Sequence, residues 1–119
     1  MTTAVLIVDD DALFRGLARR MLVGMGFTVV GEAATVTAAA TAAKELRPDA
    51  ALVDINLPDG DGFVLASMLA ALTRPPRVVL TSTDRDAGTP DGVRGCGAVG
   101  FVAKDDLPDH SLRELLAGP

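Results

Sequence analysis

Five side chains that could act together in binding or catalysis directly follow short apolar runs of the chain. They are Asp9, Asp10, Asp54, Thr81 and Lys104. If the apolar runs are parallel strands of one sheet, their carboxyl ends meet at a single edge, which is where such sheets bind their ligands. Three carboxylates, a hydroxyl and an ammonium group would then lie together.

This set of groups predicts a cation site that handles phosphate. Carboxylates sharing a low-dielectric cleft repel one another unless a cation lies among them. Hard oxygen ligands suit Mg²⁺, which leaves coordination positions open for water or a phosphoryl oxygen. Lys104 would add a positive charge and Thr81 a hydrogen bond. Because phosphoryl transfer depends mainly on positioning and charge neutralisation, and a carboxylate can be the nucleophile, Asp54 is a candidate phosphoryl acceptor.

The elements that must place these groups alternate along the chain. The sequence predicts strands at 4–8, 27–31, 50–53, 78–80 and 99–103, and helices at 12–25, 36–46, 63–72 and 109–116. An apolar stripe in the first of these helices consists of Leu13, Leu17, Met21 and Met25. The alternation favours an α/β fold with a parallel sheet and right-handed crossovers. A length of 119 residues suits one domain, 1–119.

The stretch between Asp84 and Gly97 departs from this alternation. A fourth helix belongs there, yet the stretch contains Gly88, Pro90, Gly92, Gly95 and Gly97. In a helix interior each Gly costs about 1 kcal/mol relative to Ala, and a Pro costs about 3 kcal/mol. We therefore expect a short or irregular fourth helix.

Composition argues against several classes of protein. The net charge of −5 and the lack of any run of Lys and Arg argue against direct nucleic-acid binding. No apolar run approaches the roughly 20 residues that cross a bilayer, and the first residues lack the pattern of a signal peptide. The single cysteine, Cys96, cannot form an internal disulfide, which fits a reducing compartment. We expect a cytoplasmic protein without membrane association.

Several residues have simpler interpretations than a role in the site. Asp11 precedes the first helix, which favours an N-cap over a metal ligand. Asp59 and Asp61 stand next to glycines and are interpreted as turn residues. His110 falls in the first turn of the last helix, where we expect a solvated side chain and not a phosphocarrier. Cys96 is expected to be a small buried hydrophobe.

Four segments of the chain also match a known family. They are Val8–Asp11, Val53–Gly62, Val79–Ser82 and Gly100–Lys104. In order and spacing they resemble the receiver domains of response regulators in two-component signalling, and the resemblance covers almost the whole chain. It implies a flavodoxin-like, doubly wound sheet of five parallel strands in the order 2-1-3-4-5.

The resemblance implies roles for the residues of the candidate site. Asp54 corresponds to the phosphoacceptor, and Lys104 to the lysine that pairs with the phosphoryl oxygens. Asp9 and Asp10 correspond to the acidic pair that organises Mg²⁺, Asp10 directly and Asp9 through water. Asn56 stands where the family donates a backbone carbonyl to the metal.

Switching and signal lifetime also follow from the resemblance. Thr81 corresponds to the switch hydroxyl that moves to bind the phosphoryl group. Phe101 corresponds to the aromatic residue that turns inward when that hydroxyl moves. Asn56 and Thr83 occupy the two variable positions that tune autodephosphorylation.

A phosphorylation-driven signalling switch is the function that this resemblance implies. A sensor histidine kinase or a phosphotransfer protein would deliver the phosphoryl group. Catalysis would be limited to weak self-phosphorylation and autodephosphorylation, so the chain is not interpreted as an enzyme. Asp105 after Lys104 resembles receivers attached to helix-turn-helix output domains. A C-terminal DNA-binding effector domain outside this chain and a homodimer are therefore both open expectations.

Two other functions stay open. A receiver-like interaction module that does not switch would agree with the weakened fourth-helix region, although the intact set of strand-end residues opposes it. A small Mg²⁺-dependent phosphatase for an external substrate would need a substrate cap, for which little chain is left.

Overall fold

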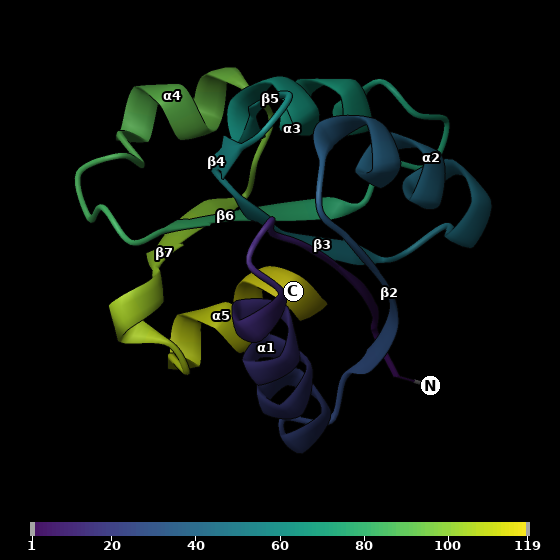
Figure 1. Cartoon of the computed structure of the whole chain (residues 1–119), viewed down its shortest axis with the longest axis vertical. Helices are drawn as coiled ribbons and strands as arrows, with labels where there is room; N and C mark the ends of the chain where they lie inside the picture. The colour runs from purple at the N-terminus through teal and green to yellow at the C-terminus, as the bar shows by residue number, and fades with distance from the viewer. Residues whose placement is uncertain (1, 119) are drawn as a thin grey trace.

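The computed structural model describes residues 2–118, which fold around a five-stranded parallel sheet (Figure 1). The strands are β1 (Ala4–Val8), β2 (Thr28–Ala33), β3 (Ala50–Asp54), β6 (Arg77–Ser82) and β7 (Gly100–Ala103). They lie in the order β2-β1-β3-β6-β7, and each neighbouring pair is parallel. Counted among these five alone, this is the predicted order 2-1-3-4-5, so the flavodoxin-like fold is confirmed.

Helices cover both faces of the sheet (Figure 1). One face carries α1 (Ala12–Gly24) and α5 (His110–Ala117), and the other carries α2 (Val36–Leu46), α3 (Gly62–Ala70) and α4 (Pro90–Gly95). The two-residue strands β4 (Asn56–Leu57) and β5 (Gly60–Asp61) form a small antiparallel hairpin. A single 3₁₀ turn, η1 (Lys104–Asp106), follows β7. None of the helices in residues 2–118 has the length and apolar character needed to cross a membrane.

Strand alternation divides the core into two layers. Val5 and Ile7 of β1 face α1 and α5, whereas Leu6 and Val8 face α2, α3 and α4. Residues 5–8 and 50–53 are buried on both sides. The central strands therefore read as continuous apolar runs, as strands covered on both faces do.

Helix α1 buries only half of the predicted stripe, because Met21 and Met25 pack against the core and Leu13 and Leu17 do not. Leu13 and Leu17 are 75% and 55% exposed, whereas Ala18 and Leu22 pack in the core. A four-residue spacing fits both stripes, which lie about 100° apart around the helix. Contact with the sheet centres the buried face about one residue later than the predicted stripe, and Met21 and Met25 stay half-buried beside it.

Local capping accounts for the ends of the helices near the site. The Asp11 carboxylate accepts a hydrogen bond from the Leu13 N–H at 3.0 Å, which confirms the predicted N-cap. The short fourth helix is also confirmed, because α4 has six residues, with Thr89 as N-cap and Pro90 first.

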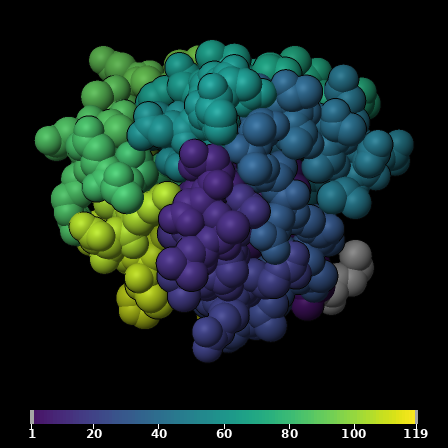
Figure 2. Space-filling view, in the orientation of Figure 1, coloured from purple at the N-terminus to yellow at the C-terminus, as the bar shows by residue number. Residues whose placement is uncertain are grey.

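Strand β2 begins and ends later than predicted, at Thr28 and Ala33. The N-terminal, middle and C-terminal segments of the chain meet on one face (Figure 2).

Candidate functional site

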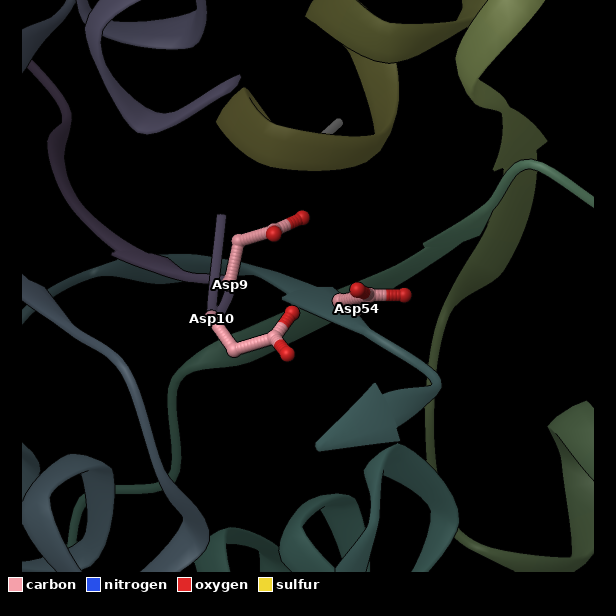
Figure 3. A group of neighbouring side chains, drawn as sticks. All are labelled: Asp9, Asp10 and Asp54. Carbon is pink, nitrogen blue, oxygen red and sulfur yellow. The ribbon is translucent and has the colours of Figure 1, made fainter. Parts of the chain in front are cut away.

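Three carboxylates gather at the carboxyl edge of the sheet (Figure 3). Asp9 and Asp10 follow β1, and Asp54 is the last residue of β3, its neighbour in the sheet. Each offers an oxygen within 4.8 Å of the others. Asp9 is fully buried and Asp54 is 5% exposed, whereas Asp10 lies open to solvent. The cluster therefore has two buried charges and one accessible charge.

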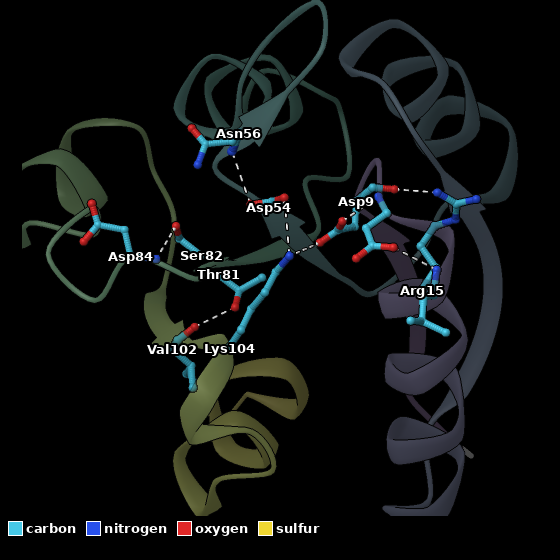
Figure 4. Close-up of polar contacts among 11 residues, drawn as sticks. Asp9, Arg15, Asp54, Asn56, Thr81, Ser82, Asp84, Val102 and Lys104 are labelled. Atoms are coloured by element: carbon cyan, nitrogen blue, oxygen red, sulfur yellow. Dashed lines mark hydrogen bonds and ion pairs between the residues drawn. The ribbon is translucent and has the colours of Figure 1, made fainter.

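Lys104 brings a positive charge to this cluster from the end of β7 (Figure 4). Its Nζ lies 2.7 Å from Oδ2 of Asp9 and 3.5 Å from Oδ2 of Asp54. The same ammonium group stands 4.1 Å from the centre of the Phe14 ring, a cation–π contact that helps to hold it. The lysine thus bridges the two buried carboxylates, as the alignment of strand ends predicts.

Electrostatics leave the cluster short of positive charge. Burial raises the pKa of Asp54, and the charge of Asp9 adds to this; the N–H of Asn56 and the Lys104 ammonium oppose it without cancelling it. Burial lowers the pKa of Lys104, but its hydrogen bond to Asp9 and the charge of Asp54 outweigh burial and raise the pKa overall. One ammonium group shared between two buried carboxylates keeps its proton and does not fully compensate them.

The donor set fits a hard divalent cation. Oδ2 of Asp9 is buried and has no hydrogen bond of good geometry within residues 2–118, so it depends on the Lys104 ammonium. Asp10 makes its carboxylate available from the solvent side. Clustered carboxylate oxygens with room for water are the surroundings that Mg²⁺ prefers.

The Thr81 hydroxyl is engaged away from the carboxylates. Thr81 pairs with Asp54 in the register of β3 and β6, and it is fully buried. Its hydroxyl donates to the carbonyl of Val102 at 2.7 Å (Figure 4). The next residue, Ser82, accepts from the N–H of Asp84 at 3.0 Å. The structure brings Thr81 to the site edge but gives its hydroxyl a partner on β7.

The remaining predicted residues surround this edge. The N–H of Asn56 donates to Oδ1 of Asp54 at 3.2 Å, and its side chain is exposed on β4. Thr83 is exposed directly after β6. Phe101 on β7 is half-buried and packs against the α2/α3/α4 core layer.

Asp59 has a structural role that the sequence does not predict. It lies in a turn, as predicted, and its carboxylate also accepts from the N–H groups of Val36 and Thr37 at 2.7 and 3.1 Å. It thereby caps α2 from a loop 22 or more residues away in the chain. Asp61 is not a turn residue as predicted: it ends β5 and caps α3 through the Val64 N–H at 2.8 Å. The predicted surface position of His110 and burial of Cys96 are confirmed.

Two residues of α1 reach the site and were missed altogether. The ring of Phe14 contacts the Lys104 ammonium, and the Arg15 guanidinium donates to the backbone carbonyl of Asp9 at 2.7 Å. Their place in the first turns of the helix that follows the acidic pair was the available signal.

Comparison with known proteins agrees with this geometry. Residues 5–116 match the family described as the response regulator receiver domain. A putative transcriptional regulator of Pseudomonas aeruginosa is 35% identical over 112 residues, which cover 94% of this chain and 52% of that protein. A protein-glutamate methylesterase/protein-glutamine glutaminase of Anaeromyxobacter dehalogenans is 40% identical over 84 residues, which cover 70% of this chain and 25% of that protein. This chain therefore spans between a quarter and about half of these two relatives.

Solved structures show the same likeness. The signal receiver domain of the putative response regulator NarL from Mycobacterium tuberculosis superposes with a TM-score of 0.77 at 36% identity, covering 87% of this chain and 85% of that one. The receiver domain of a modulated diguanylate cyclase from Desulfovibrio desulfuricans gives a TM-score of 0.82 at 30% identity, covering 98% and 92%.

Proposed function

The chain belongs to the response regulator receiver domain family, and from that premise we propose that it is a phosphorylation-dependent switch whose Asp54 accepts a phosphoryl group. Residues 1–119 would form one receiver domain. The observation that carries the proposal is the convergence at one sheet edge of a buried acceptor carboxylate, two further carboxylates and a bridging lysine. The three strands that these groups end or follow are β1, β3 and β7. Other strands separate them in the sequence, so only the folded chain brings the groups together.

Asp9, Asp10 and Asp54, with the backbone carbonyl of Asn56, would hold Mg²⁺, which neutralises the charge of a transferring phosphoryl group. An oxygen of the Asp54 carboxylate forms the new bond to phosphorus. The bond between phosphorus and the donor breaks, and the donor atom, a histidine nitrogen in a kinase, keeps its electron pair. Lys104 exchanges its 3.5 Å contact with the carboxylate for the phosphoryl oxygens.

The switch would begin at Thr81. Its hydroxyl now donates to the Val102 carbonyl at 2.7 Å, and donating to a phosphoryl oxygen on Asp54 requires it to give up that bond. Phe101, on the strand paired with β6, would turn inward as the hydroxyl moves. Asn56 and Thr83, both exposed beside the site, would set the lifetime of the phosphorylated state.

The partners we propose follow from this chemistry. A sensor histidine kinase or a phosphotransfer protein would donate the phosphoryl group in the cytoplasm, and self-phosphorylation and autodephosphorylation would be the only catalysis. A C-terminal DNA-binding effector domain finds support in the Pseudomonas aeruginosa relative, which is described as a putative transcriptional regulator and is about twice as long as the matched region. A homodimer is a second proposed output.

Mass spectrometry after incubation with Mg²⁺ and acetyl phosphate tests the proposal. The wild-type protein should gain one phosphoryl group, and Asp54→Asn should abolish the gain, because the amide cannot form the acyl phosphate. Asp61→Asn is the matched control, since this exposed residue caps α3 and lies outside the cluster. A wild-type protein left unmodified, with no Mg²⁺-dependent binding of beryllofluoride either, would favour the non-switching interaction module.

A further inference from the structure

Arg15 reaches the candidate metal site from outside the sheet edge. One of its terminal nitrogens donates to the backbone carbonyl of Asp9 at 2.7 Å, and its Nε donates to Oε1 of Glu32 on β2 at 3.1 Å (Figure 4 shows the first contact). The side chain is 20% exposed, so most of its length packs within the protein. A guanidinium group with two fixed acceptors has little freedom to move.

The turn that Arg15 touches carries both acidic residues of the pair. Asp9 is already fixed at its N–H, which donates to Ala33 at 3.0 Å, and at Oδ1, which accepts from the Asp11 N–H at 2.9 Å. Lys104 contacts Oδ2. Arg15 adds the fourth point of attachment, the carbonyl that leads directly into Asp10. That peptide sets the direction of the exposed Asp10 carboxylate.

Glu32 holds the guanidinium in place from the far side. It also accepts from Nε of Arg19 at 2.8 Å. These hydrogen bonds, that of Arg19 first, lower the pKa of Glu32, so the carboxylate stays ionised. Arg15 and Arg19 therefore share one anchor, but of these two arginines only Arg15 has a hydrogen bond to Asp9 within residues 2–118.

We propose that Arg15, anchored by Glu32, is a positioning residue that fixes the Asp9–Asp10 peptide for cation binding. The inference rests on the proposed function, because it concerns how well the acidic cluster is arranged for Mg²⁺. Groups that orient metal ligands commonly affect affinity without touching the metal.

The direction in which Mg²⁺ affinity changes when Arg15 is removed separates a positioning role from an effect of its charge alone. Arg15 is a cation beside an acidic cluster, so as a charge alone it repels Mg²⁺, and its removal should tighten binding. As a positioning residue it improves binding, and its removal should weaken it. The two roles predict opposite shifts in the Mg²⁺ dissociation constant.

Isothermal titration calorimetry of the metal-free full chain with Mg²⁺ measures the dissociation constants of wild type and variants. Arg15→Gln should weaken binding about 10-fold, the lower end of what loss of a ligand-orienting partner costs. Arg19→Gln, the matched control, should stay within about twofold of wild type, because Arg19 hydrogen-bonds Glu32 and not Asp9 within residues 2–118, and its 43% exposed side chain is screened by solvent. Arg15→Lys keeps the charge that repels Mg²⁺ but cannot fork between two acceptors, so it should bind Mg²⁺ at least as weakly as Arg15→Gln. Unchanged or tighter binding by Arg15→Gln would overturn the proposal.

A second readout needs no metal. Hydrogen exchange of the Asp11 amide, which bonds the Asp9 carboxylate, should speed up several-fold in Arg15→Gln and not in Arg19→Gln, at equal thermal stability of the two variants. Equal exchange in both would contradict a positioning role. If wild-type protein fails to bind Mg²⁺, the proposed function fails, and this exchange comparison still decides whether Arg15 positions the turn.

Discussion

The sheet edge that carries the acidic cluster and the segment from residue 83 to residue 99 are built on different principles. At the sheet edge, side chains are placed by strand register, and the groups that matter are buried charges. In segment 83–99 one short helix of six residues lies between loops. Its packing depends on glycines, which leave space for neighbouring side chains.

Two glycines show how segment 83–99 packs. A Cβ atom on residue 88 would collide with the ring of Phe101, and one on residue 92 would lie 3.2 Å from the ring of Phe63 and 2.9 Å from Oγ1 of Thr89. Gly88, in the loop before α4, and Gly92, within α4, therefore make room for two aromatic rings. Arg85, with both terminal nitrogens 2.8 Å from the Asp106 carboxylate, ties this loop to η1.

The two regions therefore resist substitution in different ways. The sheet edge tolerates little change in charge, because buried carboxylates need compensation. In segment 83–99, a larger residue is poorly tolerated at a glycine whose side-chain space is filled by an aromatic ring. At the other positions of the segment a larger residue is tolerated.

The largest effect should come from removing the bridging cation. In the absence of Mg²⁺, Lys104→Met should lower the free energy of unfolding by about 3 kcal/mol, because it leaves the buried Asp9 carboxylate without its partner. Urea denaturation measures this. Lys44→Met on the exposed surface of α2 is the control, and adding Asp9→Asn to Lys104→Met should recover much of the loss. A Lys104→Met variant as stable as the control would show that register, and not charge, dominates the sheet edge.

A smaller loss should follow Gly88→Ala, about 1–3 kcal/mol for overpacking against the Phe101 ring. Combining it with Phe101→Leu should relieve part of the loss. Gly95→Ala is the control within the same segment, since its Cβ would meet nothing within 4 Å other than its chain neighbours and the backbone of its own helix. It should be neutral or stabilise by up to about 1 kcal/mol. Equal effects of the two substitutions would mean that segment 83–99 does not pack as described.

The smallest effect concerns Asp59, which links the loop beside the site to α2. Hydrogen bonds from the Val36 and Thr37 N–H groups lower the pKa of Asp59, so its ionised form stabilises the fold. Asp59→Asn should lower Tm by a few degrees at pH 7, because the amide keeps one acceptor oxygen but loses the second acceptor and the negative charge. Because the folded-state pKa is depressed, the difference is full above the ordinary Asp pKa and disappears as the pH falls through the lowered value. A difference independent of pH between 7 and 2 would contradict this account.

Much of the fold and most of the site could be predicted from the sequence, for a physical reason. Strands covered on both faces must be continuous apolar runs, so a polar residue that ends a run marks a strand end. Asp9, Asp54, Thr81 and Lys104 are recognisable on this basis alone, and the parallel order brings those ends to one edge. Glycines and a proline likewise predicted the short α4.

Only the tertiary structure decided the rest, because it depends on contacts between segments far apart in the chain. The rotation of α1 exposes Leu13 and Leu17, since the sheet selects one of two stripes that the spacing allows. Asp59 caps a helix to which it is not adjacent in sequence, and Arg15 reaches back to the Asp9 carbonyl. Local sequence specifies which groups end each strand, whereas packing alone determines which side chains hold them in place.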